Sequence, residues 1–595
     1  MAFKAHAFPW VAILTAGSVL AAGEVQAQQP GSAEPPAATI VEELTVNVVN
    51  IDVHVTDRGG RPISDLSIDD FEVFEEGEPV EVTNFLSASA RDDRAWTEGD
   101  ALRDLEVPDM PLMVALYIDR YRTSQGNLLR IEDDLGSFLG RRGDQDGAGV
   151  RFMLATGDPE LNVRVPFTVD AAELTEALNE LRSEPRALAH DDEILRGQIL
   201  REMRLTYEVC AQPPSSSNNP GCEPCVDQWP SLVGSANQYA AAMQSRSGPS
   251  LSALGELVTA LGGLPGPKAL IYVSDGLPQR PGADFYHYLG EICPERQSET
   301  DALERTWDDT TLFNQFSAFS NANRVTIYPV DAAGIRPPSS VDTSLAGGLG
   351  DLAGEGTGAY NLSTVLVPSR RNDRVRVDNL QATLSLLADE TGGRAVFNQA
   401  RPAEALEEIA ADFGSYYSLG FSAPPGGRHP IRQVDVRLAK PGKGWRVRYR
   451  RSYILKSQEQ RLADRLFAAL KLDEQDNPLD VDVTFGEITP ASEAPAATLP
   501  VEVHIPASAV TLLPGPSGPT GALRIFLVAE NEDGERTSMR QKTLTLSQAQ
   551  LPPPEESAVV VVNVDLPPGR FDVAVGIRDE ASGRGSYLVR DIALP

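Results

Sequence analysis

Two aspartates stand at the ends of predicted strands, where an α/β sheet binds small ligands. Asp119 closes the apolar run PLMVALYI, and Asp275 closes the run ALIYVS. An unbroken apolar run of this kind predicts a strand that is buried on both faces. In open sheets of parallel strands, ligands bind beyond the carboxyl ends of the strands, where the strand order reverses. We therefore expect Asp119 and Asp275 to share one site at that edge of a sheet.

Hydroxyl groups lie close to both aspartates in the sequence. Thr123 and Ser124 come shortly after Asp119, and Ser274 comes directly before Asp275. Carboxylates, hydroxyls and waters are the ligands that Mg²⁺ takes in proteins. The sequence therefore predicts a site for Mg²⁺, or for Mn²⁺ or Ca²⁺.

The rest of the sequence offers no second kind of active site. Its six histidines show neither HExxH nor HxH spacing, and it has no Gly-x-Ser-x-Gly elbow and no Walker loop. Lys and Arg total 52 against 85 Asp and Glu, so the formal net charge is −33. This negative charge argues against nucleic acid and against a general phosphate-binding protein, both of which need a basic face. We therefore expect neither an enzyme nor a nucleic-acid partner.

The two aspartates need a sheet to position them, and residues 108–425 have the pattern of one. Apolar strand runs alternate there with amphipathic helical stretches, and the last strand run is YYSLGFS at 416–422. This alternation predicts a parallel sheet that helices cover on both faces. Residues 186–250 interrupt it as an inserted subdomain, and residues 338–378 form a looser insertion. We expect a doubly wound, mostly parallel α/β sheet of the Rossmann kind.

Further β-strands flank this domain on both sides. Residues 44–95 and the hairpin at 426–453 each have too few strands to bury a core alone. We therefore expect these two segments to pack together as one β-sandwich module. Residues 454–475 suit a helical linker. Short strands at regular spacing from 476 to 595 predict a C-terminal β-sandwich.

The N-terminus predicts export from the cytoplasm. Lys4 precedes an apolar run, and the motif VQA ends at Ala27. We expect residues 1–27 to be a signal peptide cut after Ala27, followed by a flexible linker at 28–43; an uncleaved anchor helix is the alternative. No later stretch of about 18 apolar residues exists, so no further membrane span is expected. The mature protein would be secreted or periplasmic.

Four cysteines remain in the mature chain: Cys210, Cys222, Cys225 and Cys293. In an oxidising compartment an even number predicts two disulfides, with three connectivities open. The Cys-x-x-Cys pair also fits half of a zinc site or a redox pair. However, its loop-like surroundings lack the strand that precedes a thioredoxin motif, so disulfides are our prediction.

The order of these motifs resembles the von Willebrand factor type A domain. An Asp after the first strand and Asp-Gly after the fourth, here Asp275-Gly276, carry the likeness. Over residues 44–453 the chain is more closely similar to the von Willebrand A-related domain proteins of acidobacteria, through LPGPKALIYVSDGLP, LADETGGRAVFN and YYSLGFS. The resemblance implies a doubly wound domain with flanking β modules. It also implies a metal-ion-dependent adhesion site that binds a protein ligand.

The metal site that the resemblance implies is only partly present. The family binds its cation through Asp-x-Ser-x-Ser, a Thr from a second loop and the Asp after the fourth strand. Here Asp119 and Asp275 match the two aspartates, and Thr123 replaces the second serine. Tyr121 stands in place of the first serine, and its hydroxyl lies several ångström further from the backbone. Ser250 is the best candidate for the second-loop ligand, although a helix N-cap is its alternative role.

Positive charge also weakens the predicted metal site. Arg120 and Arg122 lie beside Asp119 in the sequence and would oppose a cation. We therefore expect an exported, adhesion-type protein that binds a protein ligand through a von Willebrand A-like domain with a partly degenerate metal site. An envelope assembly or structural factor without metal is the first alternative. A hydrolase with an unrecognised active site is the second.

Overall fold

The structure is a computed structural model of the chain. It describes residues 47–88, 112–143, 150–184, 195–203, 223–336, 370–399, 402–413, 415–423, 430–490, 497–515, 518–553 and 556–594. The expected signal peptide and linker at 1–43 lie outside these residues. Among the described residues, no helix is long and apolar enough to cross a membrane.

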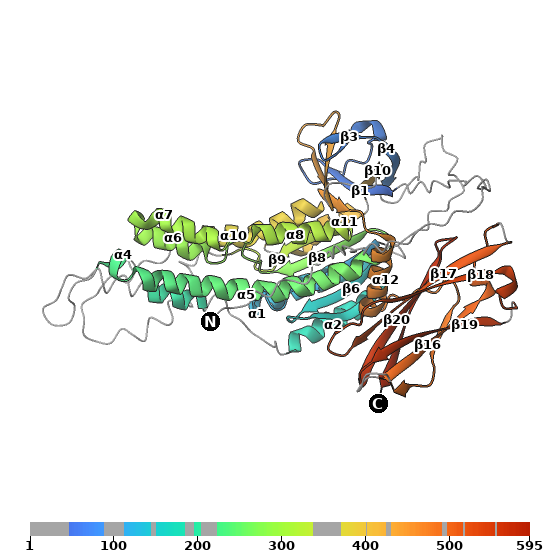
Figure 1. The fold of residues 1–595 in the computed structure, drawn as a ribbon. Helices are drawn as coiled ribbons and strands as arrows, with labels where there is room; N and C mark the ends of the chain where they lie inside the picture. The colour runs from blue at the N-terminus through green and yellow to red at the C-terminus, as the bar shows by residue number, and fades with distance from the viewer. Residues whose placement is uncertain are drawn as a thin grey trace, which may run out of the picture. The chain divides into compact units, whose positions relative to one another are not determined.

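A five-stranded mixed sheet lies at the centre of the α/β part (Figure 1). Its strand order is β7 (Leu161–Thr168), β6 (Val150–Gly157), β5 (Leu112–Ile118), β8 (Lys268–Ser274) and β9 (Val325–Asp331). All neighbours run parallel except β7, which is antiparallel to β6. The chain builds outward from β5 in one direction and then returns to build from β8 in the other. The strand order therefore reverses between β5 and β8, the two strands that end at the predicted aspartates.

Helices cover both faces of this sheet, because side chains of a strand alternate between its faces. Val114, Leu116 and Ile118 of β5 pack with α1 (Gln125–Gly143), α2 (Ala171–Ser183) and α11 (Pro402–Phe413). The alternate residues Ala115 and Tyr117 pack with α5 (Trp229–Gly262), α8 (Thr310–Ala322) and α10 (Arg370–Thr391). This burial on both sides explains why the strand runs read as unbroken apolar sequence.

Two expectations about the α/β part need correction. The strand predicted at 416–422 is β10 (Tyr416–Ala423), and it lies in an antiparallel sheet between β1 and β4 rather than in the parallel sheet. The second is the segment AVFN at 395–398, for which the same alternation predicts a strand; it contributes only a single bridge, between Val330 and Val396. In both cases a helix before the strand suggested the α/β rhythm, but the strand's partners are fixed by tertiary packing.

The flanking strands form one module with two four-stranded sheets. The first has the order β12 (Arg446–Tyr449), β1 (Asn47–Thr56), β10, β4 (Val82–Ala88), and the second has β13 (Ser452–Ile454), β11 (Ile431–Leu438), β2 (Phe71–Glu75), β3 (Glu78–Val80). Side chains from both sheets share one apolar core around Ile51, Val73 and Leu419. Segments that are more than 300 residues apart in the sequence are therefore paired in this module.

The predicted insertion is helical. The helical residues 195–203, α4 (Pro224–Asp227), the first half of α5, α6 (Ala283–Ile292) and α7 (Gln297–Thr306) share a separate apolar core. In Figure 1 these helices lie beside the part of α5 that extends past the sheet. We call this part the helical extension. Its boundary differs from the predicted one, because α5 runs unbroken through Pro249 and α6 and α7 also belong to it.

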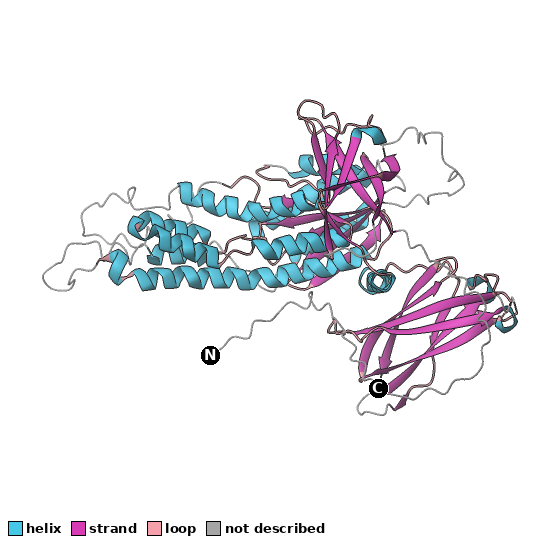
Figure 2. Cartoon of the chain, turned by 45° about the horizontal axis from the view of Figure 1, so that its top comes forward, coloured by secondary structure: helices cyan, strands magenta, loops and turns pink. Residues whose placement is uncertain are grey.

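The C-terminal part begins with α12 (Gln458–Leu472) and continues as two antiparallel sheets, drawn as magenta arrows in Figure 2. One sheet joins β14 (Asp482–Phe485), β15 (Thr489–Pro490), β16 (Ala497–Pro506) and β19 (Ser557–Leu566). The other has the order β18 (Arg540–Ser547), β17 (Thr520–Asn531), β20 (Gly569–Asp579), β21 (Gly585–Leu594). Alternate residues of both sheets face a common core, as in a sandwich.

Candidate functional site

Asp119 lies at the carboxyl end of β5 and is completely buried. Its Oδ1 accepts hydrogen bonds from the backbone N–H of Arg122 at 3.1 Å and from the Ser250 hydroxyl at 3.3 Å. Its Oδ2 accepts a hydrogen bond from the Tyr272 hydroxyl at 3.0 Å. Both carboxylate oxygens are therefore occupied by protein donors.

Burial dominates the protonation of this carboxyl group. It raises the pKa of Asp119 from 3.8 to about 6, while the nearby Arg122 guanidinium and the donated hydrogen bonds act in the opposite direction. A cation bound to the carboxylate would have the opposite effect, because an adjacent positive charge favours the ionised form. The hydrogen-bond donors around Asp119 thus compensate its burial only in part.

Asp275 follows β8 and is half-buried. Its Oδ2 accepts the backbone N–H of Ser124 at 2.9 Å. The side-chain amide of Asn127 donates to Oδ1 at 2.9 Å and to Oδ2 at 3.0 Å. Burial raises the pKa of Asp275, and the positive charge of Arg336 lowers it. Hydrogen bonds therefore connect the loop after β5 and the first turn of α1 directly to the end of β8.

A third aspartate, Asp331 at the end of β9, joins this edge of the sheet and is almost fully buried. Arg336 Nη2 lies 2.8 Å from its Oδ1, and the Gln381 side chain of α10 donates to its Oδ2 at 2.9 Å. The same Arg336 nitrogen donates to the backbone carbonyl of Asp275 at 2.6 Å. One guanidinium therefore connects the ends of two neighbouring strands.

The structure places the four predicted metal ligands around one loop. Ser250 contacts Asp119 directly, and the Thr123 hydroxyl donates to the Asp119 backbone carbonyl at 2.7 Å. Asp275 contacts the same loop through the N–H of Ser124. Ser250 is inside α5 rather than at its start, so helix capping is not its role.

The surrounding groups do not fit a divalent cation. Mg²⁺ needs carboxylate and hydroxyl lone pairs that converge on one point in near-octahedral geometry. Here all four oxygens of Asp119 and Asp275 accept protein hydrogen bonds, and Tyr121 replaces a serine ligand. The guanidinium groups of Arg122 and Arg336 already act on the two carboxylates as positive charges.

Sequence reasoning missed the residues that close this edge: Tyr272, Asn127, Arg336 and Gln381. Tyr272 lies in the apolar run of β8, where its hydroxyl gives no periodic signal. Asn127 and Arg336 lie 148 and 61 residues from Asp275. Pairings over such distances cannot be inferred from one sequence. The one local indication in the sequence was that the polar residue Asn127 follows Thr123 by four residues, close to Asp119.

The cysteines of the helical extension are joined in part. Cys225 and Cys293 form a disulfide with a Cα–Cα distance of 5.6 Å, while Cys210 and Cys222 lie outside the described residues. Among the described residues, the one group of three His, Cys, Asp or Glu close enough to share an ion is Cys225, Cys293 and Glu295. Because both of its sulfur atoms belong to the disulfide, this group is not a zinc site.

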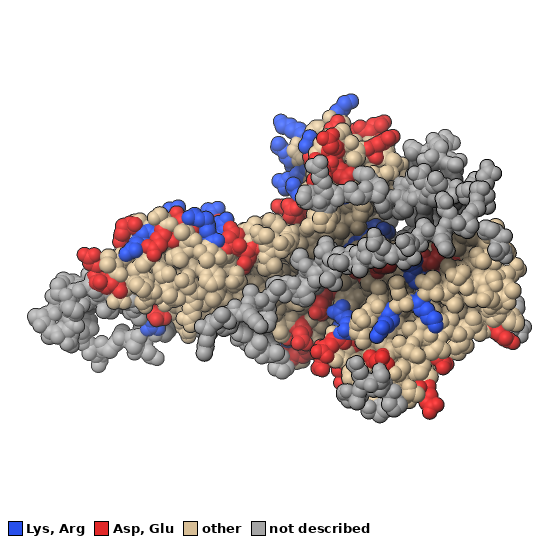
Figure 3. Space-filling view, viewed as in Figure 1, with Lys and Arg blue, Asp and Glu red and all other residues tan. Residues whose placement is uncertain are grey.

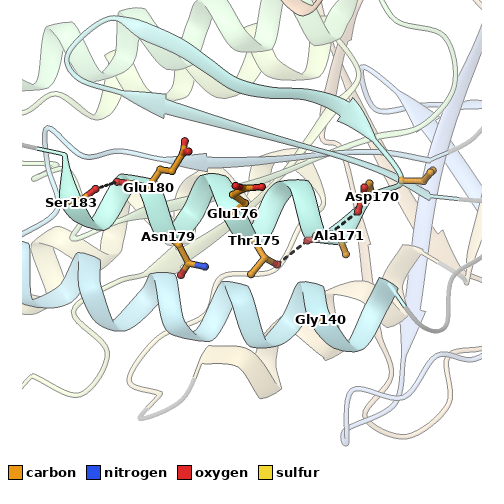
Figure 4. Close-up of a pocket in the computed structure, with 10 residues that line it drawn as sticks. Gly140, Asp170, Ala171, Thr175, Glu176, Asn179, Glu180 and Ser183 are labelled. Atoms are coloured by element: carbon orange, nitrogen blue, oxygen red, sulfur yellow. Dashed lines mark hydrogen bonds between the residues drawn. The ribbon is translucent and has the colours of Figure 1, made fainter.

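A shallow groove lies apart from the aspartates, between α1 and α2 (Figure 4). It measures about 850 Å³ and is lined by α2 from Asp170 to Ser183 and by Gly140 of α1. The Thr175 hydroxyl in its wall donates to the Ala171 carbonyl. None of the predicted site residues lines the groove, so the groove is separate from the predicted site.

Comparison with known proteins gives no family for the chain. No family model matches it, and no curated protein matches it. An aerotolerance-related membrane protein from Bacteroides fragilis and the conserved hypothetical protein BatB from Bacteroides thetaiotaomicron are similar solved structures, with 10% and 11% identity. Each match covers 51% of this chain and 98% of the other, with a TM-score of 0.21. TM-scores this low do not establish a common fold.

Proposed function

We propose that the protein is an exported, adhesion-type protein that binds a protein ligand through a doubly wound, von Willebrand A-like domain without using a metal ion. The strand order supports the assignment of the domain, because it reverses between β5 and β8. Asp119 and Asp275 follow these two strands, as the aspartates of a metal-ion-dependent adhesion site do. The antiparallel third strand and the helices on both faces agree with this assignment.

One observation carries the metal-free part of the proposal. Protein donors occupy every oxygen of the two carboxylates, and Asn127 binds both oxygens of Asp275 at once. In an adhesion site the cation would make these bonds and would offer its remaining position to a carboxylate of the ligand. Here Ser124, Asn127 and Tyr272 hold the edge together instead. The edge therefore acts as a fixed scaffold between α1, β5 and β8.

The charge distribution on the surface and the flanking β-sheets favour protein binding over the other classes of function. On the face drawn in Figure 3, acidic and basic side chains of the described residues are mixed in small groups, without an extended basic field for nucleic acid. The β module and the C-terminal sheets add further surface that a protein ligand could contact. The partner we expect is a protein of the cell envelope or of its surroundings.

The test is a binding measurement with the partner that cross-linking in the native host identifies. Affinity should be the same in EDTA, Mg²⁺ and Mn²⁺, and the isosteric variant Asp119→Asn should bind as the wild type does. Calorimetry of the protein alone should give no heat with either cation. Binding that EDTA abolishes would contradict the proposal. Covalent labelling by a serine- or cysteine-directed activity probe would favour a hydrolase instead.

A further inference from the structure

Positive charge gathers at the amino edge of the central sheet, opposite to the aspartates. The residues are Lys268, Arg324, Arg450 and Lys456, which we call the amino-edge cluster. Lys268 begins β8 and pairs with Val325, the residue after Arg324. Arg450 and Lys456 come from the segments before and after β13. These four cations come from three separate segments of a chain whose net charge is −33.

The turn at residues 321–324 brings these cations together. Arg450 Nη1 donates to the backbone carbonyl of Asn321 at 3.1 Å, and Lys456 Nζ donates to the Asn323 side chain at 2.6 Å. Arg324 closes the turn with its N–H bonded to the carbonyl of Asn321. Three cations of the cluster therefore belong to or contact this four-residue turn. Lys268 lies on the adjacent strand.

Lys268 is the buried member of the cluster, with 5% of its surface exposed. Its ammonium group has three N–H donors, and among the described residues it bonds one acceptor, the Leu264 carbonyl, at 2.9 Å. Burial, followed by the charges of Arg324 and Arg450, lowers the pKa of Lys268 to about 7. A buried ammonium without its full set of acceptors is costly, and an anion beside it would offset that cost.

Part of the positive charge is balanced by the protein itself. Lys456 is paired with Asp464 at 2.5 Å, and the exposed Asp52 acts on Lys268 and Arg450. The carbonyls that Lys268 and Arg450 bind lie at the ends of α5 and α8, where helix dipoles favour cations. Arg461, exposed and near Arg324, adds a further positive charge. The sum of these charges remains positive.

Arg324 is the exposed member of the cluster, and it makes no side-chain hydrogen bond or ion pair with the described residues. Its backbone has φ +56°, directly after the C-cap of α8. This left-handed position favours glycine, since a side chain there carries a steric cost. An arginine with an unengaged guanidinium at such a place is well situated to bind a ligand from solvent.

We infer that the amino-edge cluster binds an oxyanion of the phosphate class, held by Lys268 and Arg450 from within and by Arg324 from solvent. Phosphate suits the cluster because it carries up to two negative charges and accepts several N–H donors at once. Inorganic phosphate and the phosphate of a lipid headgroup or other ester share this chemistry. The site is independent of the aspartates at the carboxyl edge.

The test uses the mature protein at pH 6.5 with inorganic phosphate as the probe. Compared with chloride at equal ionic strength, 50 mM phosphate should raise the melting temperature of the wild type by ~2–4 °C. Arg324→Gly should fold well, because glycine suits its backbone, and should lose most of this rise. In calorimetry its affinity for phosphate should fall about tenfold or more, and Arg324→Lys should keep most of it.

Asp473→Gly is the matched control, because Asp473 is also a left-handed residue at a helix end, with φ +52°. It should keep the full response to phosphate. Equal responses in Arg324→Gly and Asp473→Gly, or no response in the wild type, would overturn the site. Vesicles with phosphatidylglycerol separate the sources: binding that Arg324→Gly abolishes indicates a lipid headgroup, and a response to free phosphate alone indicates a soluble phosphate ester.

Discussion

The side-chain amide of Asn127 donates to both carboxylate oxygens of Asp275, at 2.9 and 3.0 Å. This single amide fixes the first turn of α1 to the end of β8, although 148 residues separate the two. It therefore engages both carboxylate oxygens of Asp275, the atoms that a cation would have to contact. The relation between these two residues is therefore the most direct place to test whether the edge works without metal.

The substitution Asn127→Asp should make this edge of the sheet less stable and responsive to Mg²⁺. Two carboxylates would then face each other, so we expect a loss of about 2 kcal/mol in the free energy of unfolding at pH 7.5. Millimolar Mg²⁺ should restore part of that loss in the variant and leave the wild type unchanged, as urea denaturation would measure. Gln125→Glu is the control, since it adds the same charge at an exposed position in the same turn. A wild type that Mg²⁺ stabilises as much as the variant would contradict this prediction.

The carboxyl group of Asp119 should make stability depend on pH. Its pKa is about 6 in the folded chain against an ordinary 3.8, so the folded state holds the proton more tightly. This contribution is present below pH 4 and is lost as the pH rises through about 6. It amounts to about 3 kcal/mol.

Asp119→Asn removes this titration. Between pH 4.5 and pH 7.5 the free energy of unfolding of the variant should gain about 2 kcal/mol relative to the wild type. Urea denaturation at the two pH values measures the difference. Glu459→Gln, at an exposed position of α12, should show no such gain. A constant difference between Asp119→Asn and wild type would show that the group does not titrate in this range.

The disulfide between Cys225 and Cys293 should stabilise the helical extension. It closes a segment of 68 residues, and Cys293 is fully buried in the apolar core that α5 and α6 share. Replacing both cysteines by alanine should cost about 2–4 kcal/mol. Thermal unfolding of the variant and of the oxidised wild type measures this. Non-reducing peptide mapping should recover the linked pair, and it should also find Cys210 and Cys222 oxidised; free thiols at all four positions would refute the prediction.

Export remains a prediction from the N-terminal sequence. The mature protein should begin at Gln28, outside the cytoplasm, because the charged start, the apolar run and the VQA motif form a cleavage signal. Intact-mass analysis of the protein from its native host is the measurement. A native N-terminus that still carries Met1 would indicate the anchor helix instead.

Apolar runs were enough to find β5 and β8, and with them Asp119 and Asp275, because strands buried on both faces read as unbroken hydrophobic sequence. The same signal misplaced β10. Its sequence YYSLGFS follows a helix, as strands of a parallel sheet do, but its backbone pairs with β1 and β4, which come before the α/β domain in the sequence. Local pattern predicts that a strand exists, whereas its neighbours depend on packing that only the fold reveals.

The amino-edge cluster was hidden for a related reason. The net charge of a chain predicts only the average charge of its surface, and a net charge of −33 argued against a phosphate-binding protein. Lys268, Arg324, Arg450 and Lys456 are spread over nearly 190 residues and meet only because β8 and β9 lie side by side and the chain returns after β12. A local group of positive side chains can exist in a chain of negative net charge, and one sequence does not show where such groups form.

The shared β module also sets an order of events during synthesis. Its strands come from both sides of the α/β domain, since β1 pairs with β10 and β12, and β2 pairs with β11. A chain that crosses a membrane from its N-terminus would present β1, β2 and β4 more than 300 residues before their partners β10, β11 and β12 arrive. These early strands would have exposed edges until β12 has emerged, so they are the part of the molecule with most need of a chaperone.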